Sequence, residues 1–294
     1  MLLNAQVVAA FGRQYLARLE DGSEMICLTR GKKSEVVCGD RVEIKLTGDA
    51  SAESGAQGVI ERIAPRRSLL HRSDAFREKL IAANVTQIIV VVAAEPSFSD
   101  ELLARCLVAA YDQKLNVLIV LNKCDLAEAA AAARRRLIPY TAIGYRVLEL
   151  SAKQDVSALR PFLQGHTSVL VGQSGMGKST LINALLPDAQ AATREISTAL
   201  DSGKHTTTHA RLYPLDETSS LIDCPGVQAF GLHHLSFGGI EQGFVEFAQY
   251  LGQCRFHDCH HTHEPGCALR EAVAAGKINA RRLELFKQIA ANKA

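Results

Sequence analysis

A glycine-rich segment at residues 172–179 constrains the fold of this 294-residue chain more than any other feature. It has the pattern G-x4-G-K-S, and it lies between the apolar run 168–171 and a helix-compatible run at 181–186. Glycines allow backbone amides to wrap around a phosphate group, and the N-terminus of a following helix adds a favourable dipole. Both flanks are those that a phosphate-binding loop requires. The segment therefore predicts a strand, a phosphate loop and a helix within a parallel α/β sheet.

The predicted phosphate loop assigns roles to individual side chains. Lys178 would reach the terminal phosphates of a nucleotide and stabilise their charge during transfer, and Ser179 would bind Mg²⁺. The alternative is a glycine-rich turn that happens to precede a helix, and the fit of both flanks argues against it. The residues assigned to the nucleotide at this loop are Gly172, Gln173, Ser174, Gly175, Met176, Gly177, Lys178, Ser179 and Thr180.

Apolar runs alternate with helical patterns around this loop. The β-branched run 88–92 is typical of a strand buried on both faces of a parallel sheet, and Ser99 would cap the helix that follows it. The Ala-rich region 127–137 predicts a second helix. Further strands are expected at 117–121, 146–150, 168–171 and 220–222. Strands that alternate with helices predict a doubly wound α/β domain.

Two short polar motifs each follow a different predicted strand. Residues 122–125 have the pattern N-K-x-D, in which GTPases use the aspartate to accept hydrogen bonds from two donors on the guanine edge. Asn122 would steady the loop and the base, the stem of Lys123 would lie on the ring, and the Ala152 amide of the second motif would add another contact. Each motif alone is an ordinary polar turn, but both end strands of one sheet and together predict a guanine nucleotide. The residues assigned to the base are Asn122, Lys123, Cys124, Asp125, Ser151, Ala152 and Lys153.

Two further segments predict switches that sense the terminal phosphate. Asp223 and Gly226 form an Asp-x-x-Gly element after a short apolar strand, where the carboxylate assists Mg²⁺ through water and the glycine amide senses the phosphate. The Thr-rich run 203–208 predicts the first switch, in which Thr207, with Thr206 as the alternative, would close over Mg²⁺. The competing interpretation of this run is a solvated loop.

The order of these motifs differs from that of an ordinary GTPase. The two guanine motifs precede the phosphate loop here, whereas they follow the Asp-x-x-Gly element in the usual order. Such a circular permutation costs little when the original chain ends lay close together. Its mechanical consequence is that the second switch leads directly into the C-terminal domain.

The regions on either side predict two more domains. Residues 1–66 contain short strands separated by turns, which favours a small barrel of the oligonucleotide-binding type, although other small barrels have the same pattern. The permuted GTPase domain is expected at 67–232, and helices around a Cys/His cluster at 233–294. No apolar run is long enough to span a membrane and no secretion signal is evident, so we expect a cytoplasmic protein. A formal charge of +2 does not identify a partner.

Four residues with short spacing predict a metal site near the C-terminus. The pattern is Cys254-x4-Cys259-x-His261-x5-Cys267, and three thiolates with one imidazole suit tetrahedral zinc. A closed set of four protein ligands indicates one structural Zn²⁺ per chain. Unligated thiols near a His-rich loop are the alternative, and three other histidines could replace His261 as the ligand: His257, His260 and His263.

With these residues in view, the chain resembles the bacterial family of GTPases that depend on the small ribosomal subunit (RsgA, also called YjeQ). The resemblance covers nearly the whole chain, and its most specific marks are the motif order, the run 205–208 and the Cys/Cys/His/Cys set. It implies an oligonucleotide-binding barrel, GTP hydrolysis with Mg²⁺ that the subunit stimulates, and a role in late maturation of that subunit. The expected partners are GTP, GDP, the small subunit and its rRNA, and we expect a monomer without membrane contact.

The resemblance also bears on how water is positioned. Val227 stands where Ras-like enzymes have a catalytic glutamine, which resembles the family's hydrophobic substitution and leaves the water-positioning role vacant. His205 is the candidate for this role, and contact with RNA or solvent is the alternative. The catalytic assignments are therefore Lys178, His205 and Thr207.

Basic residues outside the motifs leave their roles open. The run 134–136 is interpreted as a solvated helix face, and Arg66, Arg67, His71 and Arg72 would either touch phosphate or form a polar linker. Two other functions compete with a ribosome assembly factor: a permuted GTPase with another RNA or protein target, and a non-hydrolysing nucleic-acid-binding zinc protein. The intact nucleotide motifs argue against the second of these.

Overall fold

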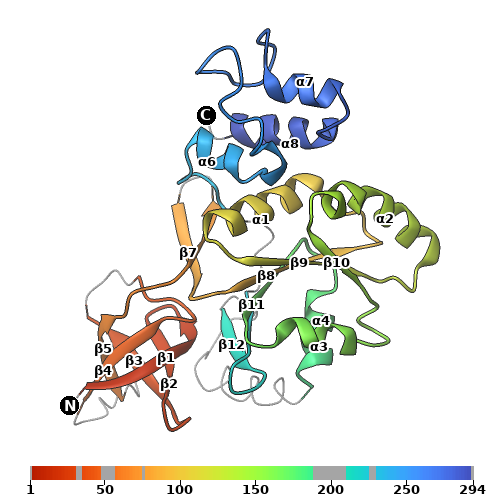
Figure 1. Cartoon of the computed structure of the whole chain (residues 1–294). Coiled ribbons are helices and arrows are strands. Elements are labelled where there is room, and N and C mark those ends of the chain that lie inside the picture. Colours follow the sequence, from red (N-terminus) through yellow and green to blue (C-terminus); the bar gives the residue numbers. More distant parts are fainter. Residues whose placement is uncertain are drawn as a thin grey trace.

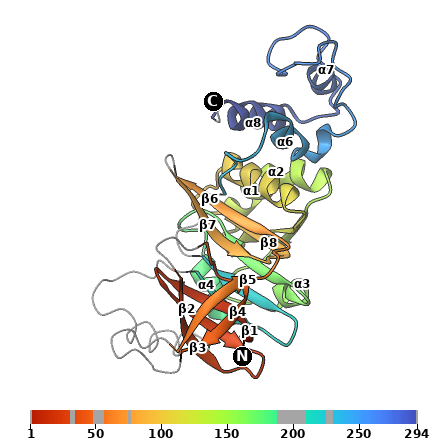
Figure 2. The same cartoon turned by 90° about the vertical axis from the view of Figure 1, so that its left-hand side faces the viewer.

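Figure 1 shows a computed structural model of the chain, with a barrel, an α/β domain and a helical C-terminal domain in sequence order. The α/β domain lies between the other two, and the view turned by 90° in Figure 2 agrees. The structure describes residues 2–30, 35–47, 57–74, 77–187, 210–224 and 230–292, with side chains omitted at 72–79. No helix of these described segments is both long and apolar enough to cross a membrane.

The first five strands close into a barrel, as predicted. Their order is β1-β2-β3-β5-β4, and β4 pairs back with β1. Alternation explains the packing, since Val42 and Ile44 of β4 point into the barrel core while Arg41 and Lys45 are exposed. The strands are β1 (Leu2–Phe11), β2 (Gln14–Leu19), β3 (Glu24–Thr29), β4 (Arg41–Leu46) and β5 (Gly58–Ile63).

A two-stranded hairpin joins the barrel to the α/β domain, and the sequence analysis did not predict it. It consists of β6 (Leu69–Asp74) and β7 (Arg77–Ala83), which pair antiparallel. Arg66, just before the hairpin, binds both carboxylate oxygens of the fully buried Asp40 at 2.7 and 2.8 Å. Arg66 is therefore engaged in holding the barrel together, and it is not a free cation for phosphate.

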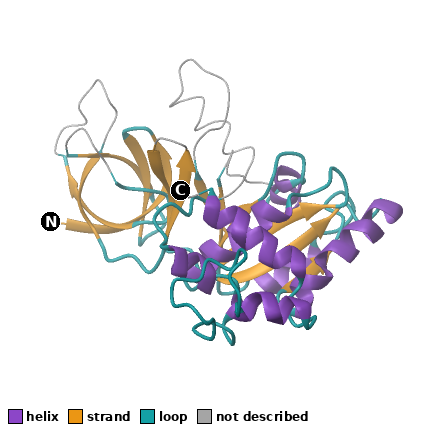
Figure 3. Cartoon of the chain, turned by 90° about the horizontal axis from the view of Figure 1, so that it is seen from above, coloured by secondary structure: helices purple, strands orange, loops and turns teal. Residues whose placement is uncertain are grey.

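The α/β domain contains the expected parallel sheet in the order β10-β9-β8-β11-β13, with β12 antiparallel at its edge. All seven residues of β8 are buried, as its β-branched run predicted. Figure 3 shows helices packed against this sheet. The strands are β8 (Gln87–Ala93), β9 (Asn116–Asn122), β10 (Arg146–Glu149), β11 (Thr167–Val171), β12 (Arg211–Pro214) and β13 (Ser220–Asp223), and the helices are α1 (Asp100–Asp112), α2 (Ala127–Ala142), η1 (Ser157–Leu159), α3 (Arg160–Leu163) and α4 (Lys178–Leu185).

The basic run on α2 is a solvated helix face at Arg134 and Arg135, as expected, and two of its arginines also contact neighbouring elements. Arg134 binds Glu149 at 2.6 Å. Arg136 donates to the Phe98 carbonyl at 2.7 Å, and its guanidinium lies 4.1 Å from the centre of the Phe98 ring. These contacts tie α2 to β10 and to the segment before α1.

The barrel and the α/β sheet are continuous. Ala9 of β1 pairs with Arg211 of β12, so the two sheets form one sheet of eleven strands. The Cys38 thiol, in the segment before β4, donates to the Val8 carbonyl at 3.4 Å and is buried in the same core as the α/β strands. The barrel is therefore joined to the edge of the sheet through hydrogen bonds as well as through apolar packing.

The C-terminal helices α6 and α8 pack on α1, as Figure 1 shows, and Arg282 of α8 also reaches α2. Phe244, Phe247 and Phe286 form a buried aromatic cluster. Arg282, only 2% exposed, pairs with Glu246 at 2.6 Å and lies over the rings of Phe244 and, from α2, Tyr140. The elements are α6 (Phe237–Gln242), η2 (Val245–Phe247), α7 (Ala268–Ala274) and α8 (Ala280–Ala291).

Candidate functional site

The glycine-rich segment forms a tight loop between β11 and α4. Gly172, Gly175 and Gly177 have φ angles of 149°, 82° and 90°, which side-chain-bearing residues rarely adopt. The Lys178 ammonium folds back over this loop and donates to the Gly172 and Gln173 carbonyls at 2.5 and 2.8 Å. The loop thus has the backbone and the cation that a phosphate group needs.

The side chains of Lys178 and Asp223 carry opposite charges that interact within the phosphate site. Burial lowers the pKa of Lys178, and the charge of Asp223 opposes this shift. Burial likewise raises the pKa of Asp223, and Lys178 opposes it. Each charge is partly desolvated and is supported by the other, which is the condition in which electrostatic interactions are strongest.

Asn122 connects the three nucleotide motifs. It is 1% exposed, and its Nδ2 donates to the Met176 carbonyl of the phosphate loop at 2.9 Å. Its Oδ1 accepts from the amides of Lys123 at 2.8 Å and Ala152 at 2.9 Å. One buried side chain therefore holds the phosphate loop against both guanine motifs.

The predicted base contacts lie together at the ends of β9 and β10. The pKa of Asp125 is lowered, first by the neighbouring Ser151 hydroxyl and then by Lys153 and Lys123. The Ser151 Oγ is buried and completes no hydrogen bond within the described part of the chain, so it lies near the carboxylate without being aligned on it. The Ala152 amide, assigned from the sequence to guanine, donates to Asn122 in this structure.

Lys123 and Cys124 complete the first guanine motif. Lys123 has a φ of 62°, and its ammonium donates to the Glu95 carbonyl at 2.7 Å. The Cys124 amide donates to the Leu150 carbonyl at 3.2 Å, which joins the end of β9 to the end of β10. Burial raises the pKa of the Cys124 thiol. The motif is thus held by backbone contacts on both sides.

Several predicted site residues lie outside the described part of the chain. They are the threonine-rich run 203–208, with His205, Thr206 and Thr207, and Gly226 and Val227 of the second switch. Ser179 and Thr180 are described and are exposed on the first turn of α4, where a ligand can reach them.

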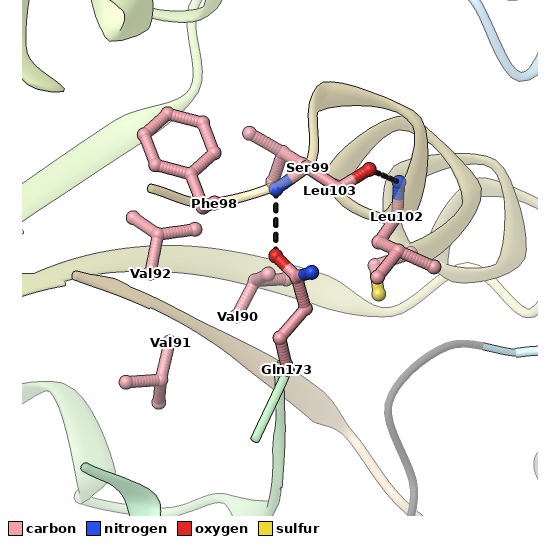
Figure 4. A pocket seen from close by; sticks show the side chains of 10 residues that line it. Val90, Val91, Val92, Phe98, Ser99, Leu102, Leu103 and Gln173 are labelled. Atoms are coloured by element: carbon pink, nitrogen blue, oxygen red, sulfur yellow. Dashed lines mark hydrogen bonds between the residues drawn. The ribbon is translucent and has the colours of Figure 1, made fainter. Parts of the chain in front are cut away.

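A small, mostly apolar pocket lies behind the phosphate loop (Figure 4). Gln173 enters it from the loop, and its Oε1 accepts from the Ser99 amide at 2.6 Å. Ser99 in turn caps α1 by accepting from the Leu102 amide at 3.3 Å. This pocket is separate from the phosphate-facing side of the loop, and its polar contact links two elements.

The four predicted metal ligands converge in the C-terminal domain. Their ligand atoms all lie within 4.8 Å of one another. His261 Nδ1 lies 3.6, 3.5 and 3.2 Å from the sulfur atoms of Cys254, Cys259 and Cys267. Tetrahedral zinc, with bonds of about 2.3 Å to sulfur and 2.0 Å to nitrogen, would place sulfur and nitrogen about 3.5 Å apart. The cluster therefore fits a metal ion of that size.

Two carboxylates support this cluster, and the sequence analysis did not predict either. Glu241 Oε1 lies 2.5 Å from His261 Nε2, which leaves Nδ1 as the ligand atom and orients the ring. Hydrogen bonds from its own backbone amide first, and then from the amides of His260, His263 and Thr262, lower the pKa of Glu264 to about 2. Burial raises the pKa of the Cys259 thiol to about 12, so the thiolate form there needs a cation nearby.

Comparison with known proteins covers the whole chain. The model of a family described as RsgA GTPase matches residues 63–233. A relative from Nitrosospira multiformis, named small ribosomal subunit biogenesis GTPase RsgA, is 54% identical over 290 residues, with 99% of this chain and 91% of the relative covered. The protein of that name from Paraburkholderia phytofirmans is 55% identical, with 96% and 91% covered.

Two solved structures share the fold over the full length. The crystal structure of YjeQ from Thermotoga maritima has a TM-score of 0.74 and 28% identity, and the match covers 100% of this chain and 99% of that one. The structure of YloQ, described as a circularly permuted GTPase, has a TM-score of 0.71 and 25% identity, with 100% and 95% covered. The barrel, the permuted sheet and the C-terminal domain therefore occur together in these relatives.

Proposed function

The chain belongs to the RsgA GTPase family, and we propose that it hydrolyses GTP in the late maturation of the small ribosomal subunit. The observation that carries the GTPase chemistry is the position of Asn122, whose side chain bonds the phosphate loop and both guanine motifs. The observation that carries the partner is the 54% identity with a small-subunit biogenesis GTPase over 99% of this chain.

The phosphate site has residues for charge stabilisation and for metal binding. In our proposal Lys178 leaves the Gly172 and Gln173 carbonyls to contact the terminal phosphates, where its charge stabilises the transferring group. Ser179 and Asp223 would hold Mg²⁺, which neutralises phosphate charge when bound. Thr207 closing over the metal and His205 positioning water stay proposals from the sequence.

The base site would select guanine through acceptors and donors on one edge. Asp125, a carboxylate at neutral pH, would accept hydrogen bonds from the base. The Ala152 amide would have to share its proton between Asn122 and the base, or exchange one for the other. The buried Ser151 hydroxyl, which makes no hydrogen bond to Asp125 in this structure, would turn toward the carboxylate when the base is bound.

The metal cluster in the C-terminal domain would hold a structural Zn²⁺. Cys254, Cys259, His261 and Cys267 supply all four ligands, which leaves no position for a reacting water. Because bound zinc favours thiolates, it would offset the burial that raises the pKa of Cys259. A metal held by these four side chains would supply folding free energy to the loop between η2 and α7.

We place the protein in the cytoplasm, where it would act as a monomer on the small subunit and its rRNA. Co-sedimentation tests the partner directly: the purified protein is mixed with small or large ribosomal subunits in the presence of a non-hydrolysable GTP analogue or GDP. Binding to small subunits that is stronger with the GTP analogue supports the proposal. Equal binding to both subunits, or none, would assign this GTPase to another target.

A further inference from the structure

The turn between β8 and α1, residues 94–100, contacts both the first guanine motif and the phosphate loop. The Lys123 ammonium donates to the Glu95 carbonyl at 2.7 Å. Gly175 of the phosphate loop approaches so closely that a Cβ there would lie 3.3 Å from Cγ of Pro96. The β8–α1 turn therefore lies directly behind the phosphate loop and beside the guanine motif.

Gln173 makes the polar link between the phosphate loop and this turn. Its Oε1 accepts from the Ser99 amide at 2.6 Å, and Ser99 begins α1 (Figure 4). An amide at a helix N-terminus has no partner within the helix, so Gln173 satisfies a donor that α1 cannot satisfy itself. A movement of α1 along this bond reaches the second residue of the phosphate loop.

The other side of the same turn contacts α2 and the C-terminal domain. Asp100 Oδ1 lies 3.0 Å from the Arg136 guanidinium of α2. Asp100 Oδ2 lies 3.7 Å from the Arg281 guanidinium of α8. Arg136 also donates to the Phe98 carbonyl at 2.7 Å. Arginines from two elements, α2 and α8, thus converge on this turn.

The body of α1 is in close contact with α6. A Cβ added at Gly243, just after α6, would lie 2.8 to 3.0 Å from atoms of Val108 in α1. Gly243 has an ordinary helical φ of −66°, so the need for glycine there is the approach of the two elements and not backbone strain. The C-terminal domain therefore cannot shift toward α1 without moving it.

We propose that Gln173 is a positioning residue through which the placement of the C-terminal domain on α1 sets the geometry of the phosphate loop. This route runs through α1 and is separate from the connection between the second switch and the C-terminal domain. The proposed role of Gln173 rests on guanine-nucleotide binding at the phosphate loop and does not depend on the small subunit. A failure of this proposal would therefore leave the proposed role in subunit maturation untouched, and the reverse also holds.

The first test removes the Gln173 acceptor in the full-length protein. Gln173→Met keeps the length of the side chain and loses the acceptor, and affinities for GDP and GTP are measured by fluorescence titration. We expect affinity to fall about fivefold, the effect of one hydrogen bond. The matched control is Ser99→Ala, which weakens the cap of α1 but keeps the amide that Gln173 binds, and it should leave affinity unchanged. Equal losses in both variants would make the effect a general loosening of α1 and would overturn the proposal.

The second test displaces the C-terminal domain in the wild-type protein and in the Gln173→Met variant. Gly243→Ala inserts a methyl group against Val108, whereas the control Gly238→Ala, in α6, adds one to open space. We expect Gly243→Ala to lower nucleotide affinity in the wild-type background. In the Gln173→Met background the same substitution should have less than half that effect on the logarithm of the affinity, because the hydrogen bond from the Ser99 amide to Gln173 is already lost. Additive effects, or no effect of Gly243→Ala, would overturn the proposal. If Gly243→Ala does not fold, Asp100→Asn takes its place in the same comparison.

Discussion

Asp125 should determine which purine the protein binds. Asp125→Asn replaces an acceptor with a donor that faces a donor of guanine, which costs about 1–3 kcal/mol, or roughly 5- to 150-fold in affinity. The variant should bind GTP more weakly and bind xanthosine triphosphate better than the wild type does. Titration of both nucleotides and of ATP measures this. If the wild type binds ATP as tightly as GTP, the assignment of the base site is wrong.

Lys178 should be required for turnover. Among the described residues, Lys178 is the only one whose side chain donates to two carbonyls of the phosphate loop. Lys178→Ala removes the positive charge that would stabilise the transferring phosphoryl group. Single-turnover hydrolysis should fall at least about a hundredfold, in line with the loss of one stabilising donor. Lys153→Ala, on the base side, is the control and should affect binding more than hydrolysis. Normal turnover by Lys178→Ala would contradict the role of the loop.

At the residue scale, the sequence was informative where a motif has a fixed local spacing. The four candidate metal ligands, the phosphate loop and the guanine motifs were predicted by spacing, and the structure brings the described members of each set together. Contacts between distant residues were not predictable in this way. Glu241 reaches His261 from twenty residues away, and Arg66 was left between phosphate contact and linker because Asp40 lies in another element.

At the scale of elements, the phosphate loop should tolerate no side chain at Gly177. Its φ of 90° disfavours any L-residue, and a Cβ there would collide with Asn122 Nδ2. Gly177→Ala should therefore break the bond from Asn122 to Met176 and abolish measurable GTP binding. Gly144→Ala is the matched control, since its φ of 96° has the same strain but open space around it. If both variants bind GTP equally well, the collision with Asn122 is unimportant.

Metal binding by the Cys/His cluster of the C-terminal domain should depend on Glu241 as well as on the four candidate ligands. Glu241→Gln keeps the shape of the side chain but weakens the bond that orients His261, and metal affinity should fall roughly 10- to 100-fold. Cys259→Ser should lose the metal and disorder the loop between η2 and α7, while GTP affinity of the α/β domain stays nearly intact. Zinc analysis and competition with a chelator measure both. Unchanged affinity in Glu241→Gln would remove this carboxylate from the site.

Elements were predictable when their pattern was local. The buried strand β8 and the barrel strands follow from β-branched runs and alternation. The β6–β7 hairpin was missed because charged residues interrupt its apolar pattern and no Gly or Pro marks its turn. The pairing of β1 with β12 joins residues about two hundred positions apart, and only the folded chain reveals it.

At the scale of the whole molecule, the barrel and the C-terminal domain each contact the α/β domain through elements next to a nucleotide motif. The barrel pairs with β12, whose neighbour β13 ends at Asp223, and the C-terminal helices α6 and α8 pack on α1. The domain boundaries at 66/67 and 232/233 stay predictions, which limited proteolysis can test. Both outer domains therefore contact elements that lie next to the nucleotide motifs.

We expect a small ribosomal subunit bound by these outer domains to accelerate GTP hydrolysis in the α/β domain. The most direct measurement is the GTP turnover rate of the full-length protein with and without small ribosomal subunits, for the wild type and for Cys259→Ser. We predict that subunits raise wild-type turnover about tenfold or more, a barrier lower by about 1.4 kcal/mol, and that Cys259→Ser keeps the basal rate but loses this increase. Equal rates with and without subunits in the wild type, or full stimulation of Cys259→Ser, would contradict the account.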